Sequence, residues 1–90
     1  LVVVVFTVDN STGELLSGPD IVSRGFVYVK ESEELISEAR LAARSVIEKY
    51  QDHYYKEWTV IKAKIRDQVS QVLYRRTKRS PMVLPIVMEV

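Results

Sequence analysis

The first eight residues restrict the possible folds of this chain most strongly, because residues 1–8 are β-branched or apolar at every position. Such a segment favours a β-strand. A strand with one face in water alternates apolar and polar side chains, and this segment does not. We therefore expect a strand that is buried on both faces and lies in the centre of a sheet. The run is too short to cross a bilayer, which takes about 20 apolar residues.

Two later segments also predict strands. Residues 25–30 are rich in aromatic and β-branched side chains, so we place the second strand there. A shorter hairpin partner for the first strand is interrupted by Gly18-Pro19. Residues 82–90 predict the last strand, and Pro85 lies inside it. Because proline has no N–H to donate to a ladder, we expect this strand at the edge of the sheet.

Between these strands the apolar residues recur every three or four positions, which predicts two amphipathic helices. Ser32 is suited to cap the first helix, which runs for about five turns to Tyr50. The second helix begins at Trp58, and its apolar stripe continues to Leu73. Pro81 ends the second helix, since proline cannot continue the hydrogen-bond ladder.

The resulting order is ββααβ, an α+β fold in which two helices pack on one face of a three-stranded sheet. Ninety residues suffice for one small domain, so we treat residues 1–90 as a single unit. The chain has no cysteine, and we see no secretion signal. We therefore expect a cytoplasmic protein without a membrane partner. The chain starts directly in the first strand, which suggests a piece of a longer protein.

The first and last strands are apolar on both faces, although the helices can cover only one. An exposed apolar face of this kind marks an interface. We expect it to dock onto a second copy or another domain, unless residues 14–24 fold over it. The sequence leaves open which alternating set of side chains points outward. The predicted interface residues are Val2, Val4, Phe6, Val83 and Val87.

The net charge of +1 conceals a strongly basic segment. Residues 53–80 contain eight basic and two acidic side chains, whereas residues 31–52 contain three basic and six acidic ones. Four of the cations follow one another closely at the end of the second helix. They could neutralise RNA phosphates, or they could simply favour the negative end of the helix dipole. These residues are Arg75, Arg76, Lys78 and Arg79.

One short segment partly matches the RNP1 motif of RNA-recognition domains, whose aromatic side chains stack on bases. Phe26 and Tyr28 occupy the aromatic positions, but Val27 stands where Gly or Ala is expected. The element order also differs from that of those domains. RNA binding through Phe26, Tyr28 and the basic end of the second helix is therefore the second hypothesis.

No catalytic or metal-binding motif is recognisable. His53 is the only histidine, and zinc sites require three or four ligands from His, Cys, Asp or Glu. Phosphate-binding glycine loops and nucleophile motifs are absent from the sequence. We assign no catalytic residue, no metal ligand and no cofactor to this chain.

Three segments resemble the C-terminal domain of ribonuclease J. They are residues 18–29 (GPDIVSRGFVYV), residues 65–68 (IRDQ) with Leu73-Tyr74 after them, and residues 77–90 (TKRSPMVLPIVMEV). The similarity spans essentially the whole chain. Ser80 is a small departure, since the family more often has Arg there.

The resemblance implies a non-catalytic C-terminal module of a ribonuclease that also has metallo-β-lactamase and β-CASP domains. Such enzymes are 5′→3′ exonucleases and endonucleases that act in mRNA decay and rRNA maturation. Their two metal ions, usually zinc, are held by a His-x-His-x-Asp-His motif that this chain lacks. In the family this module supports activity and dimerisation, so the implied partners are a second copy or a paralogue, the protein's own catalytic domains, and RNA through the whole enzyme.

Overall fold

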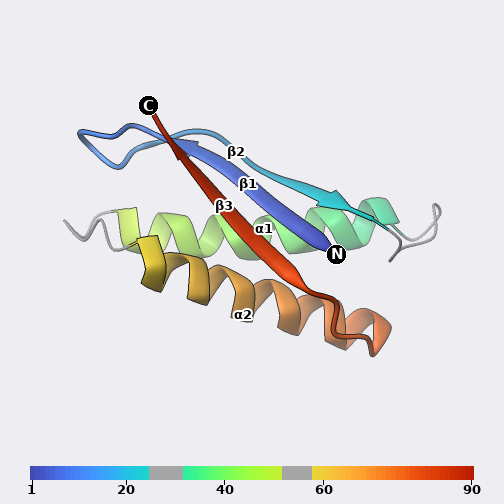
Figure 1. Cartoon of the computed structure of the whole chain (residues 1–90). Coiled ribbons are helices and arrows are strands. Elements are labelled where there is room, and N and C mark those ends of the chain that lie inside the picture. Colours follow the sequence, from blue (N-terminus) through green and yellow to red (C-terminus); the bar gives the residue numbers. More distant parts are fainter. Residues whose placement is uncertain (25–31, 52–57) are drawn as a thin grey trace.

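The computed structural model describes residues 1–24, 32–51 and 58–90. Three strands form one mixed sheet of order β2-β1-β3, and both helices lie on the same side of it (Figure 1). This arrangement confirms the predicted α+β fold and the order ββααβ. The elements are β1 (Val2–Val8), β2 (Leu15–Ser23), α1 (Ser32–Gln51), α2 (Trp58–Thr77) and β3 (Val83–Glu89).

β1 is the central strand, as predicted, and it pairs antiparallel with β2 and parallel with β3. Its side chains alternate between buried and half-buried along the whole strand. The buried set points at the helices, whereas Val3, Val5 and Thr7 point to the other side. The expectation of burial on both faces was therefore wrong for the outward set, because no described element covers it.

β2 is the main difference from the sequence prediction. It runs over Leu15–Ser23, through the Gly18-Pro19 pair that was expected to interrupt it. The register explains how the strand continues through this pair. Gly18 and Pro19 both stand opposite Phe6 alone, which makes a β-bulge. The bulge accommodates Pro19, whose ring is buried, and Gly18 adopts a positive φ of 88°. The strand predicted over residues 25–30 lies outside the described residues.

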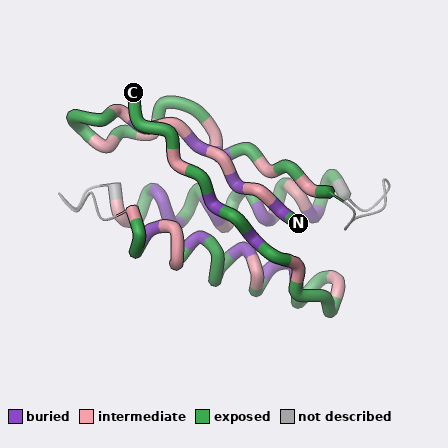
Figure 2. The backbone as a smooth tube through the Cα atoms, viewed as in Figure 1, coloured by how far each residue is buried: buried purple, intermediate pink, exposed green. Residues whose placement is uncertain are grey.

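The core fills the space between β1 and the two helices. Figure 2 shows buried positions on the sides of the helices and the sheet that face each other. Burying an Ile or Leu side chain stabilises a fold by about 1.5–3 kcal/mol. Two small side chains of α1, Ala39 and Ala43, are completely buried in this core. The buried helical residues are Leu35, Ala39, Ala43, Val46 and Ile47 on α1, and Ile61, Ile65, Val69, Val72 and Leu73 on α2.

α2 ends earlier than Pro81, the residue expected to terminate it. Lys78 has a positive φ of 59° and stops the helix directly after Thr77. The N–H of Lys78 donates to the carbonyl oxygen of Tyr74 at 2.8 Å. A left-handed residue after the last helical position is a common way to end a helix, and here it replaces proline as the stop signal.

Candidate functional site

The side of the sheet that faces away from the helices is largely apolar. Strand register aligns its residues in three rows, each with a β1 residue in the middle. Alternation along each strand places these residues on one face. The outer sheet face consists of Val22, Val3 and Leu84, of Asp20, Val5 and Ile86, and of Ser17, Thr7 and Met88.

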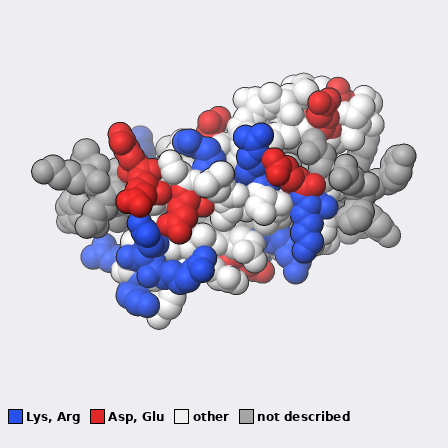
Figure 3. All heavy atoms as spheres, turned by 180° about the vertical axis from the view of Figure 1, so that it is seen from behind, with Lys and Arg blue, Asp and Glu red and all other residues white. Residues whose placement is uncertain are grey.

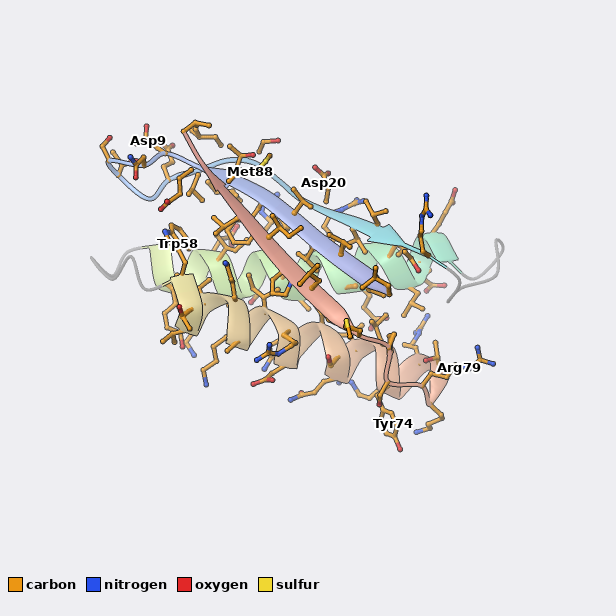
Figure 4. All side chains as sticks on the ribbon, in the orientation of Figure 1. Asp9, Asp20, Trp58, Tyr74, Arg79 and Met88 are labelled. Carbon is orange, nitrogen blue, oxygen red and sulfur yellow. The ribbon has the colours of Figure 1, made fainter. Side chains whose placement is uncertain are left out.

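No described element covers the outer sheet face. Its apolar side chains on the flanking strands are strongly exposed, with 54% for Val22, 45% for Leu84 and 50% for Met88. Figure 4 shows Asp20 and Met88 on the side of the sheet opposite the helices. Cross-strand neighbours within a row have Cβ atoms about 5 Å apart, and successive rows lie two residues apart along β1, about 7 Å, so the three rows are contiguous. Such a patch is typical of an interaction surface.

The five residues predicted as the interface lie on the opposite, helix-covered face. Val2, Val4 and Phe6 are at most 1% exposed, Val83 is 5% exposed, and Val87 packs against the core. Phe6 also meets the ring of Trp58 edge-on, with ring centroids 6.1 Å apart. These residues are core residues, because the apolar stripes of the helices cover the even-numbered side chains of β1. The candidate interface is corrected to the other alternating set.

Sequence reasoning found both alternating sets of the first and last strands apolar and left open which set points outward, but the residues that it named as the interface belong to the inward set. It missed Val22, because the second strand was expected later in the chain. The adjacent β-branched pair Ile21-Val22 was the available signal for a strand there.

Both edges of the sheet are poorly suited to pairing with another strand. Two hydrogen bonds show which residues of the last strand face β1. The Val2 N–H donates to the Met82 oxygen just before β3, and the Val90 N–H just after it donates to the Val8 oxygen, so the even-numbered residues bond to β1. Pro85 therefore stands at a position where an N–H would point to the free edge. The edge of β2 is distorted by the bulge at Gly18-Pro19. Protected edges discourage strand addition, so the outer sheet face is the better candidate for an interaction surface.

The four cations predicted to bind RNA do not act as one group. Arg76 faces α1, and its guanidinium lies 3.7 Å from Glu34 and 3.5 Å from Glu38. Arg75, Lys78 and Arg79 are exposed and have no ion pair with any described residue. Figure 3 shows a basic group beside an acidic one at the end of the molecule where α2 stops. Arg76, whose side chain is itself 45% exposed, is thus paired with α1, whereas the other three cations have no acidic partner among the described residues.

The described residues include no group suited to hold a metal ion, no buried polar residue and no membrane-spanning helix. Among them, no group of three or more His, Asp or Glu side chains could hold a metal ion. Within the same ranges no polar or charged residue is buried. Neither described helix is long and apolar enough to cross a membrane. His53, Phe26 and Tyr28 lie outside the described residues.

Comparison with known proteins provides the family. A sequence model described as "Ribonuclease J C-terminal domain" matches residues 1–90. The chain belongs to the ribonuclease J C-terminal domain family. It is 46% identical to Ribonuclease J2 of Bacillus subtilis over 90 residues, and 43% identical to Ribonuclease J 2 of Staphylococcus epidermidis over 88 residues.

The matches cover nearly all of this chain but only a small part of each relative. The chain is covered completely by the B. subtilis protein and to 98% by the S. epidermidis protein, but it spans only 16% of the length of either relative. The resemblance to the ribonuclease J C-terminal domain is confirmed. Both relatives are named as ribonucleases, whereas the chain aligns with one sixth of each.

Proposed function

We propose that this chain is a non-catalytic association module of a ribonuclease J-like nuclease, and that it joins two copies through the outer sheet face. The observation that supports this proposal most directly is the continuous exposed apolar surface around Val3, Val5, Leu84, Ile86 and Met88. Any metal-dependent hydrolysis in mRNA decay or rRNA maturation would belong to catalytic domains outside these 90 residues. We expect the whole protein to act in the cytoplasm.

A second copy is the occupant that the surface favours. A two-fold interface brings the same patch together from both sides, so the patch must be compatible with itself. The outer sheet face meets this condition because it is apolar except for Ser17, Thr7 and the single carboxylate of Asp20. Because the sheet edges are blunted, two copies would pack face to face as a sandwich, with the sheets about 10 Å apart.

The test is the oligomeric mass of the full-length protein that carries this domain. We expect Leu84→Asp to weaken self-association by about 100-fold or more in Kd, because the carboxylate would lose its water against an apolar partner. Light scattering coupled to size-exclusion chromatography measures the mass. Leu41→Asp is the matched control, since Leu41 is 66% exposed on α1, away from the sheet.

Circular dichroism would establish that both variants remain folded. A folded Leu84→Asp protein that keeps the wild-type mass across dilution would overturn the proposal. A loss of mass in both variants would also count against it, because the effect would then not be specific to this face.

A further inference from the structure

The C-terminal end of α2 carries three cations next to an exposed aromatic ring. Tyr74 is 51% exposed, and the ammonium of Lys78 lies 5.5 Å from the centre of its ring. Arg75 and Arg79 are exposed on the same end of the helix, and Figure 4 shows Tyr74 and Arg79 together at that end. We call Tyr74, Arg75, Lys78 and Arg79 the basic end.

The backbone of the basic end is held by specific hydrogen bonds. The Thr77 hydroxyl donates to the carbonyl oxygen of Leu73 at 2.7 Å and accepts the N–H of Arg79 at 3.1 Å. Lys78 occupies the left-handed region, and its N–H is bonded to Tyr74. The cations therefore project from an ordered turn, so less conformational entropy is lost when they meet a ligand.

The helix dipole accounts for only some of the positive charges at the basic end. Cations in the last turn of a helix interact with its negative end, and this effect fades within one turn. Arg75 lies in that turn, as does Arg76, which already has Glu34 and Glu38 as partners. Lys78 and Arg79 follow after the helix has ended. An anionic ligand would therefore interact with positive charge that neither the helix end nor a described carboxylate compensates.

We propose that the basic end binds single-stranded nucleic acid, with backbone phosphates at Arg75, Lys78 and Arg79 and one base stacked on Tyr74. Cations that follow a phosphate backbone, combined with an exposed ring that accepts any base, are the features of single-strand binding sites. The carboxylates of Glu34 and Glu38 lie on the α1 side of Arg76. They repel phosphates, so the strand would lie on the side of α2 away from α1.

This inference does not depend on the proposed association, because the basic end shares no residue with the outer sheet face. Either proposal can be wrong while the other one holds. Basic-end variants should keep the oligomeric mass of the full-length wild-type protein, and Leu84→Asp should keep the basic end intact.

The first test removes the three charges together, as Arg75→Gln, Lys78→Gln and Arg79→Gln in the full-length protein. The probe is a fluorescein-labelled, 12-nucleotide single-stranded oligouridine, measured by fluorescence anisotropy. Three lost phosphate contacts should flatten the slope of log K against log salt by about 2, because each contact on a single strand contributes about 0.7. The ratio of the wild-type binding constant to that of the triple variant should therefore fall roughly 15- to 20-fold between 50 and 200 mM salt.

The matched control removes three charges from the middle of the same helix, as Lys62→Gln, Lys64→Gln and Arg66→Gln. It changes the net charge equally and should leave the slope within about 0.5 of the wild type. The proposed site would be overturned if the salt slope flattened equally in both triple variants, or if it did not flatten in the basic-end variant.

The second test examines stacking. Tyr74→Leu should weaken binding of the single strand about fivefold or more, because a base–aromatic contact is lost while the charges remain. Ultraviolet crosslinking followed by peptide mass spectrometry should place the crosslink on the peptide containing Tyr74. Equal binding of a 12-base-pair duplex, with no effect of Tyr74→Leu, would refute single-strand recognition.

Discussion

The indole N–H of Trp58 donates a hydrogen bond to Glu89 Oε1 at 2.6 Å. Trp58 is the first residue of α2 and Glu89 is the last residue of β3, so the contact fastens the start of one element to the end of the next. The same indole ring meets Phe6 of β1 edge-on. One side chain thus links the helix layer to both the centre and the edge of the sheet.

Breaking this link should reduce stability measurably. We expect Trp58→Phe and Glu89→Ala to show a coupling of about 1 kcal/mol in a double-mutant cycle, because the bond involves a carboxylate but is exposed to solvent. Urea unfolding of the single and double variants gives the four free energies of unfolding. Additive effects of the two substitutions would show that the hydrogen bond contributes nothing.

Neighbouring residues of β1 should respond in opposite ways to a new charge. Val4→Asp should unfold the domain, because Val4 is completely buried and the carboxylate would have no partner there. Val5→Asp, on the outer sheet face, should remain folded and cost about 1–2 kcal/mol. Far-ultraviolet circular dichroism and urea unfolding distinguish the two. A folded Val4→Asp protein would contradict the assignment of the faces.

The glycine in the bulge should tolerate no side chain. A Cβ on Gly18 would lie 2.7 Å from the carbonyl oxygen of Val5, and the residue has a positive φ of 88°. We expect Gly18→Ala to cost about 3 kcal/mol or more in free energy of unfolding. Gly13→Ala is the control, since Gly13 has a φ of 78° but open space around it, and should cost about 1 kcal/mol. Similar costs at both positions would argue against the close approach in the bulge.

The carboxylate of Asp9 should remain ionised at unusually low pH. Hydrogen bonds from the Ser11 hydroxyl at 2.6 Å, and then from the N–H groups of Thr12 and Ser11, lower its pKa in the folded chain. The stabilisation is therefore present above the unfolded aspartate pKa of about 3.9 and is lost as the pH falls through the lowered value. A carbon-detected NMR titration measures this pKa directly.

Ser11→Ala should raise the pKa of Asp9 back toward its ordinary value, because the first of these hydrogen bonds is removed. Ser17→Ala, at an exposed position on β2, should leave it unchanged. An Asp9 pKa that does not respond to Ser11→Ala would mean that the turn contacts do not stabilise the charge.

Several elements could be predicted from the sequence because their signals are local. The continuous apolar run of β1 indicated its central place, and Pro85 indicated the edge position of β3. The sheet order confirms both predictions. The spacing of Ile61, Ile65 and Val69 indicated the buried side of α2. β2 was misplaced because Gly18-Pro19 is a strong break signal, and only a pairing partner with a bulge makes it compatible with a strand.

The sequence by itself determined the number and type of elements, their order, and the presence of two apolar faces on the sheet, since periodicity and β-branching act over short distances. Only the tertiary structure decided which face is outward. The two alternating sets of β1 are almost equally apolar, so the docking of both helices on the Val2–Val4–Phe6 side selects the core and leaves Val3 and Val5 outside. Tertiary contacts likewise separated Arg76, which pairs with Glu34 and Glu38 of α1, from the three cations that have no acidic partner among the described residues.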